Sequence, residues 1–478
     1  MVSHKIQTDI VHCFAEEFIE SVIQEVGHDI FCLLVDESAD VSDKEQMAVV
    51  FRFVDKHGIV KERFVGLVHV QETSSLSLKC DVDSLFAKHG LSMKKLRGQG
   101  YDGASNMKGE FNGLRSLILR ECNSAYYVHC FAHQLQLGLN QDVSFQRPGK
   151  TRWGSHYKTL LRLVDLFSSI IKVLEYVEKD GSDGIKRRQA NGLLNYFHTF
   201  EFVFYLQLML LLLGITNSLS KVLQRKDLDI LNAMSLVKST KQQLYKLREN
   251  GWESLINKVF FFCENYKTEL LVMDDEFNSK NSRKRSNITN LHHYKVECFY
   301  IVLDMQIQEF NDRFDEVNTE LLGCIASLSP SDSFREFDHL KVMRLSEFYP
   351  EDFSHMERMT LEHQLGLYID NIREDERFSN LKNLGDLACM MVETEKHLSH
   401  PQVYRLLKLV LTLPVATATV ERCFSAMKIV KTSLRNRISD QFLNDCVVCF
   451  VEKELFEKLT NDAVIKIFQK MESRRINL

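Results

Sequence analysis

The pattern of apolar and polar residues near the start of the chain predicts a helix followed by three antiparallel strands. Residues 8–26 place apolar side chains at the i, i+3, i+4 and i+7 positions of an amphipathic helix. An unbroken apolar run then ends at Asp36, as expected for a buried strand that terminates in a carboxylate. Two further extended runs, at 46–54 and 59–70, flank a polar turn that contains a glycine, so we expect a three-stranded meander.

A helix and further strands extend this sheet. Residues 77–89 show a second helical pattern that closes on Gly90 and returns the chain toward the sheet. Three antiparallel strands followed by a crossover helix are the opening of a ribonuclease H-like fold. With a short fifth strand at 126–129, the sequence predicts an α/β protein built on a mixed five-stranded sheet.

Composition and charge limit the class of protein. The 478 residues, 45% of them apolar, can supply a sizeable core, and only 5 prolines and 20 glycines leave room for long helices. The balance of 60 basic against 65 acidic residues excludes a protein that binds nucleic acid over its whole surface, so any such binding must be local. The 12 cysteines lack paired metal-type spacing and residues 1–10 lack a secretory leader, which predicts free thiols in a reducing intracellular compartment.

The middle of the chain is helical almost throughout. From residue 156 to about residue 411 the apolar periodicity predicts consecutive helices without a nucleotide motif, so we expect a large all-α insertion. Its most apolar run, residues 202–213, is shorter than the about 20 residues needed to cross a bilayer. We therefore expect a buried helix there and no membrane partner. A polar break at 278–287 contains the basic triplet 283–285, which is either a weak nuclear-import signal or a solvated loop.

Two aspartates lie at the ends of predicted strands. Asp36 ends the first strand, where a solvated strand end or a cap is the ordinary interpretation. Asp102 lies in a glycine-rich stretch that holds a carboxylate in a fixed place without bulk, although a structural turn with an Asx cap has the same signature. Ser105 or Asn106 is expected to cap a helix that runs to about Glu121. One sheet would bring both acids to the same end.

A third acid, Glu421, lies on a helix expected to run to about residue 435, with the preceding threonines as caps. Its apolar stripe consists of Cys423, Met427, Val430 and Leu434. Its charged face carries Lys428, Lys431 and Arg435 beside Glu421. A solvated face is the ordinary interpretation, but three cations beside one carboxylate would also suit a metal-bound phosphate.

Two further clusters carry candidate chemistry. Cys130 and His133, next to His129, raise the question of zinc, but a tetrahedral site needs four ligands and no second close pair accompanies them. The ligand count argues against zinc and favours hydrogen bonding or packing at a helix start. The strongest local nucleic-acid signature is a loop that contains Arg147, Lys150, Arg152 and Trp153. The alternative is a buried tryptophan that anchors the next helix.

Four motifs resemble the hAT superfamily of transposases, most closely the transposase-derived proteins called zinc-finger MYM-type protein-like or TTF-type-domain-containing. They are RGQGYDGASNM at 97–107, HCFAHQLQL at 129–137, TRWGSH at 151–156 and ATVERCFSA at 418–426. The resemblance extends over nearly the full chain. It implies a ribonuclease H-like core interrupted by the all-α insertion, with Asp36, Asp102 and Glu421 as the acidic triad.

The resemblance also implies cofactors, partners and boundaries. An active triad would bind two Mg²⁺ or Mn²⁺ ions. The expected DNA contacts are Arg147, Lys150, Arg152, Trp153, Cys130, His133, Lys428 and Lys431, with Arg152 and Trp153 handling a flipped base at a transposon end. The expected divisions are 1–145 for the first part of the core, 146–393 for the all-α insertion, 394–458 for the dimerisation region with the last core helix, and 459–478 for the tail.

Two departures from the family bear on activity. Relatives carry an N-terminal zinc-binding domain for DNA targeting, whereas this sequence begins just ahead of the first core helix. Relatives also have a longer helical stretch before the motif that contains Arg147, whereas here Leu137 and Arg147 are only a short loop apart. Loss of that helical stretch would remove packing beside Asp102. We therefore favour a nuclear, domesticated or decayed relative that keeps the fold for DNA contact and for dimerisation with itself or a related hAT protein. The apolar runs at 406–413 and 442–451 are the expected partner surface, with core packing as the alternative. The competing function is an active metal-dependent DDE transposase.

Overall fold

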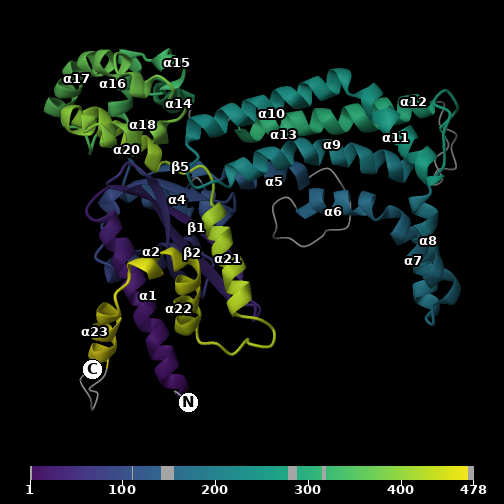
Figure 1. Ribbon diagram of the computed structural model, residues 1–478, viewed down its shortest axis with the longest axis horizontal. Coiled ribbons are helices and arrows are strands. Elements are labelled where there is room, and N and C mark those ends of the chain that lie inside the picture. Colours follow the sequence, from purple (N-terminus) through teal and green to yellow (C-terminus); the bar gives the residue numbers. More distant parts are fainter. Residues whose placement is uncertain (1–2, 110, 141–154, 278–287, 315–318, 472–478) are drawn as a thin grey trace. The chain divides into compact units, whose positions relative to one another are not determined.

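The computed structural model describes residues 3–109, 111–140, 155–277, 288–314 and 319–471. The chain forms two compact units (Figure 1). The first comprises Met1–Gln134, Leu223–Met234 and Val317–Leu478, and the second comprises Leu135–Val222 and Ser235–Glu316.

A five-stranded mixed sheet forms the centre of the first unit, as predicted. Its strands lie in the order β3-β2-β1-β4-β5. Their bounds are Phe31–Ala39 for β1, Glu45–Val54 for β2, Val60–His69 for β3, Leu96–Tyr101 for β4 and Tyr126–His129 for β5. The first three strands pair antiparallel, whereas β4 runs parallel to β1 and β5 parallel to β4. The antiparallel meander and its parallel extension are thereby confirmed.

Helices from both ends of the chain pack on this sheet. The bounds are His4–Val26 for α1, Ser75–Lys88 for α2, Ala418–Val430 for α21, Asp440–Val451 for α22 and Asn461–Met471 for α23. Helix α21 lies against β1, β2 and β3, while α22 packs between β3 and α1. Phe86 of α2 packs its ring on Phe31 and Phe51, so α2 covers the face of β1 that carries Phe31. Because strand side chains alternate, Leu34 and Asp36 belong to the opposite face.

The remaining helices of the first unit lie after the fourth strand and in the later half of the chain. They are η1 at Met93–Lys95, α3 at Ser105–Lys108, α4 at Leu114–Glu121, α14 at Thr319–Ala326, α15 at Ser331–Phe334, α16 at His339–Glu347, α17 at His355–Arg373, η3 at Glu376–Phe378, α18 at Leu384–Glu393, α19 at Lys396–Ser399, α20 at Pro401–Thr412 and η4 at Lys453–Lys458. Helix α5, Phe131–Asn140, starts in this unit directly after β5.

The described part of the second unit is helical apart from its loops and one isolated bridge. Its helices are α6 at Ser155–Asp165, α7 at Phe167–Asp180, α8 at Gly184–Phe197, α9 at Phe200–Leu223, α10 at Ile230–Asn250, α11 at Trp252–Tyr266, α12 at Asn290–His292, η2 at His293–Tyr300 and α13 at Ile301–Phe314. Phe204 of α9 packs its ring against Trp252 and Tyr294, which ties three of these helices into one core.

Helix α9 is longer than the apolar run from which it was predicted. The apolar run at 202–213 is only part of a 24-residue helix, which is long and apolar enough to cross a membrane by length and composition. In its most apolar window, 44% is buried within the protein. A long apolar helix can equally be the central helix of an all-α unit. The full burial of Phe204 fits that second role.

Two local predictions were wrong. The helix expected from Ser105 to Glu121 is divided into α3 and α4, and the residue that caps α3 is Ala104, without a side-chain bond. The Asn106 amide instead donates to the Glu37 carboxylate at 3.0 Å. The helix that carries Glu421 ends at Val430, so Leu434 lies beyond it and is 98% exposed instead of belonging to an apolar stripe.

Candidate metal centre

The parallel pairing of β1 and β4 brings the two predicted aspartates to one edge of the sheet. Leu34 pairs with Gly100, so Asp36 and Asp102 lie two residues further along neighbouring parallel strands. A Cβ atom at Gly100 would lie 2.8 Å from the Leu34 side chain and 3.1 Å from Pro414. A larger residue at this position would require the Leu34 side chain and Pro414 to move. The Asp102 carboxylate accepts a hydrogen bond from the Ala104 amide at 3.1 Å, which holds it at the start of the loop.

A buried polar network positions the first turn of α21 and with it Glu421. The Thr419 hydroxyl donates to the Glu62 carboxylate, which also accepts from the Arg52 guanidinium at 2.9 Å. Arg52 and Glu62 are opposite each other on β2 and β3, and their side chains are 1% and 4% exposed. The predicted threonine cap is wrong, because Thr417 starts α21 without a side-chain cap bond and Thr419 bonds to the sheet.

His133 is placed by contacts between the start of α5 and the segment before α21. The Phe131 amide donates to the Val415 carbonyl at 3.0 Å, and the Thr417 amide donates to Cys130 Sγ at 3.2 Å. The Thr417 hydroxyl lies 3.4 Å from His133 Nδ1. The hydrogen-bonding role expected for Cys130 at a helix start is thus confirmed.

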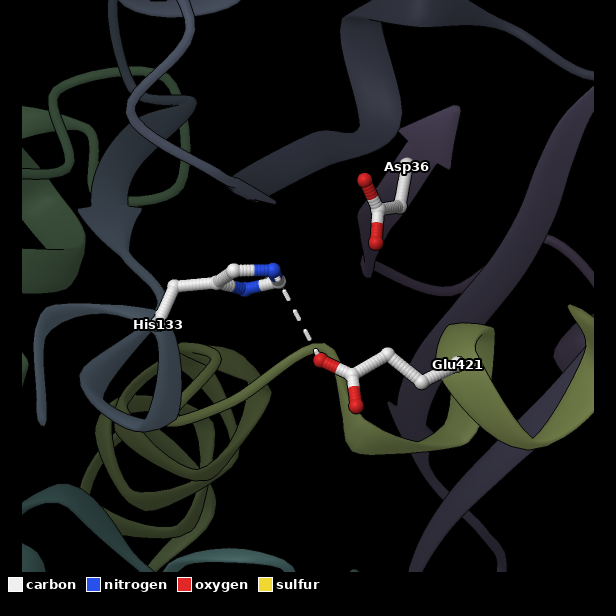
Figure 2. A group of neighbouring side chains, drawn as sticks. All are labelled: Asp36, His133 and Glu421. Carbon is white, nitrogen blue, oxygen red and sulfur yellow. Dashed lines mark ion pairs between the residues drawn. The ribbon is translucent and has the colours of Figure 1, made fainter. Parts of the chain in front are cut away.

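Asp36, His133 and Glu421 converge from β1, α5 and α21 (Figure 2). One ligand atom from each lies within 4.8 Å of the other two, and His133 Nε2 is 3.6 Å from Glu421 Oε1. Among the described residues, Asp102 does not belong to this group. The arrangement therefore places an imidazole, instead of the second aspartate, between the first and third acids of the predicted triad.

Two sequence profiles match regions of the chain that contribute the two carboxylates of this centre, while His133 lies outside both. Residues 1–113 match the RNase-like domain of ZMYM1/FAM200, and residues 377–455 match the hAT family C-terminal dimerisation region. Both ends of the chain are thus similar to transposase-derived proteins, the C-terminal one to the hAT family. Asp36 lies in the first matched region and Glu421 in the second, so the centre joins both.

Two curated relatives of this chain have the same name. The 52 kDa repressor of the inhibitor of the protein kinase from Homo sapiens is 23% identical over 487 residues, and that from Mus musculus is 23% identical over 488 residues. Each alignment covers 90% of this chain and 62% of the relative. The chain therefore spans less than two thirds of the length of these relatives.

Burial dominates the electrostatics of the centre. It raises the pKa of Asp36 to about 7, with His133 opposing and Asp102 adding to the shift. It also raises the pKa of Glu421 to about 9. For His133, burial acts to lower the pKa, but the charge interaction and hydrogen bond with Cys130, together with Asp36 and Glu421, outweigh it and raise that pKa to about 10. The group therefore retains protons to a higher pH than the same side chains in water.

Half of the predicted DNA contacts lie outside the described residues. Arg147, Lys150, Arg152 and Trp153, the loop before them and the basic triplet at 283–285 all lie outside the described residues. Lys428 is exposed on α21, consistent with a charged face. The prediction for Lys431 was wrong. Its side chain is 1% exposed, and its ammonium pairs with the buried Asp40 carboxylate at 2.6 Å. It fixes the end of α21 to the sheet and is not on an open cationic face.

Sequence reasoning missed Arg52, Glu62 and Asp40 as parts of the support of the centre. The strand pattern contained a signal for this network. Arg52 interrupts an apolar run that predicts a buried strand, and a charged side chain is seldom buried unless it is paired. A buried arginine requires a buried carboxylate, and Glu62 on the next strand is a neighbour at the matching register.

The described donors fit the expected pair of Mg²⁺ or Mn²⁺ ions only in part. Asp36 and Glu421 supply the oxygen atoms that these ions prefer, but the third donor within reach is the His133 nitrogen. An all-oxygen set with Asp102 would require the imidazole to leave. As the side chains lie, the centre has a mixed nitrogen and oxygen donor set.

Proposed function

We propose that this hAT-derived chain acts by protein association, as a domesticated relative that forms a dimer with a second copy or with a related hAT protein. The observation that carries the proposal is the match of residues 377–455 to the hAT dimerisation region. The structure supports it because this region is an integral part of the sheet unit. Glu452, just after α22, accepts from the Phe64 amide at 2.7 Å and from the Arg63 guanidinium at 3.0 Å.

Most residues of the apolar runs that the sequence suggested as partner surface are buried, although Phe450 of the second run is 49% exposed. Leu406, Leu407, Leu409, Leu443, Val447 and Val448 are all at most 1% exposed, so the core-packing alternative holds for them. Within the matched region, Ile429 is 63% exposed and Leu434 is 98% exposed. A cleft of about 750 Å³ lies beside Leu434, lined also by Ile438 and Phe442. An exposed apolar side chain next to a cleft suits the self-complementary contact of a two-fold dimer.

We expect the protein to sediment as a dimer at micromolar concentration and the double variant Ile429→Asp, Leu434→Asp to sediment as a monomer. Two carboxylates would have to be buried without partners in the contact, which raises the dissociation constant at least tenfold. The matched control is Leu340→Asp, at a position 78% exposed but outside the matched region. A monomeric wild-type protein across the micromolar range would contradict the proposal, as would loss of the dimer in the control.

We further propose that the dimer works in the nucleus and contacts DNA. The relatives are named as repressors, and the resemblance places base-handling residues in the loop that holds Arg152 and Trp153. Basic side chains with one indole suit phosphate contact and base stacking. A fluorescent fusion excluded from the nucleus would count against this part of the proposal.

A second candidate function is metal-dependent cutting of DNA, favoured by the place of Asp36 and Asp102 at one edge of the sheet. We expect no cleavage of hairpin or duplex DNA with Mg²⁺ or Mn²⁺, because Asp102 does not join the described ligand group. Cleavage that disappears in the Asp102→Asn variant would establish the enzyme instead. Cleavage that persists in that variant would indicate a contaminating nuclease.

A further inference from the structure

We propose that Asp36, His133 and Glu421 form a binding site for one zinc-class transition ion. This site goes beyond the association proposed above and differs in ligands and in ion from a pair of Mg²⁺ ions held by three acids. Imidazole nitrogen suits Zn²⁺ and its neighbours in the first transition row, whereas Mg²⁺ is held by oxygen.

The spacing of the donors fits one small ion. His133 Nε2 and Glu421 Oε1 are 3.6 Å apart, which is too long for a hydrogen bond. Two ligands at about 2.1 Å from a tetrahedral zinc ion lie roughly 3.4 Å from each other. All three donors lie within 4.8 Å, so modest rotations of the Asp36 and Glu421 side chains would close the set. Figure 2 shows that the three groups face a common point.

In the described part of the chain, one of these donors has no hydrogen bond and only the ion pair with His133 at 3.6 Å. Glu421 Oε1 is buried and has no hydrogen-bond partner among the described residues. Asp36 is 9% exposed, and one of its oxygen atoms accepts from the Glu37 amide at 2.9 Å. A buried carboxylate oxygen without a partner is expensive, and a cation between it and the imidazole would remove that cost.

The surroundings of the imidazole match those of a metal-bound histidine. Thr417 Oγ1 lies 3.4 Å from His133 Nδ1, on the far side of the ring from Glu421. A proton on Nδ1 can be donated to that hydroxyl, which leaves the Nε2 lone pair directed at the carboxylates. Outer partners of this type fix the tautomer and orientation of histidine ligands.

The ligand count that argued against zinc considered only residues close in the sequence. Folding adds Asp36 from the first strand and Glu421 from α21 to His133. Three protein ligands with a fourth position left for water are the composition of an open zinc site. A proton on His133 is the competing occupant, since an imidazolium would also balance the two carboxylates.

Metal titration separates the ion from the proton. Purified full chain, stripped with a chelator, is titrated with Zn²⁺ by calorimetry and with Co²⁺ by visible absorption. We expect one ion per chain, retention of binding in Asp102→Asn, and at least a hundredfold weaker binding in His133→Ala and Glu421→Gln. Thr417→Val, which removes the outer hydroxyl and leaves the hydrogen bond between Cys130 and His133, should weaken binding about tenfold. Each variant is checked for folding by circular dichroism, and His133→Asn replaces His133→Ala if the latter does not fold.

Three results would overturn the site: no Zn²⁺ bound at this stoichiometry, equal binding in His133→Ala, or loss of binding in Asp102→Asn. Strong near-ultraviolet charge-transfer bands in the Co²⁺ form would also do so, because they indicate cysteine ligands. Each chain has 12 cysteines, so this readout is needed. Sedimentation of the stripped protein tests the dimer separately, and failure of either proposal leaves the other standing.

Discussion

Replacing Glu62 with alanine is expected to destabilise the sheet unit by about 3–5 kcal/mol and to leave much of the protein unfolded. The Arg52 guanidinium, 1% exposed, would keep its charge in the core without a carboxylate. Its remaining hydrogen bonds go to the backbone carbonyls of Leu411, Lys226 and Leu228, which do not neutralise it. Chemical denaturation followed by circular dichroism measures the loss.

A solvent-exposed pair provides the matched control for Glu62→Ala. Arg225 and Asp227 form an ion pair whose side chains are 62% and 65% exposed. Asp227→Ala should therefore change the free energy of unfolding by less than about 1 kcal/mol. The double variant Arg52→Met, Glu62→Leu should recover only part of the lost stability, because apolar side chains replace both charges but leave the Thr419 hydroxyl and three backbone carbonyls without their partners. A loss in Glu62→Ala no larger than that of the control would show that Arg52 is not buried as described.

The same network explains why part of the fold was predictable and part of the centre was not. The five strands follow from local alternation and from turn residues, which the sequence displays directly. Asp102 directly follows β4, whereas Asp36 lies within β1, which continues to Ala39 instead of ending at the carboxylate as predicted. The parallel pairing of β1 and β4 was enough to bring the two to one edge. Glu421 depends instead on Thr419 bonding to Glu62, a contact across 357 positions that no local pattern shows.

The position of His133 in the centre could not be predicted from the sequence for a similar reason. Its motif was recognised, but its direction depends on Thr417 and on the backbone of Val415, which are remote in sequence. The prediction that Lys431 belongs to the charged face of α21 was wrong because helical periodicity does not indicate where a helix ends. The helix ends at Val430, and the chain then turns to bury Lys431 against Asp40.

With metal removed by a chelator, we expect the free energy of unfolding to fall as pH rises from about 5 to about 9. The pKa of Glu421 rises from its ordinary 4.5 to about 9 in the folded protein, and that of Asp36 from 3.8 to about 7. In this window the folded protein retains protons that the unfolded chain has released, so folding becomes less favourable with increasing pH. His133, whose pKa rises from 6.5 to about 10, acts in the same direction.

Cys130 opposes this trend. Its pKa is lowered because His133 and nearby hydrogen bonds outweigh burial, so it adds stability only as its thiol ionises below the ordinary 9.0. Three groups against one leave a net loss of stability, to which each pH unit of retained proton contributes up to about 1.4 kcal/mol. Thermal melts at pH 5, 7 and 9 in a common buffer measure it.

The variant Glu421→Gln isolates the largest contribution to the pH dependence. It should match the wild-type protein in stability at pH 5, where the folded carboxyl is protonated, and exceed it at pH 9, where ionisation of a buried carboxyl destabilises the wild type. Glu72→Gln, at an exposed position, should leave the pH profile unchanged. A wild-type protein that gains stability between pH 5 and pH 9 would show that Glu421 is ionised and solvated, and would place it outside a buried centre.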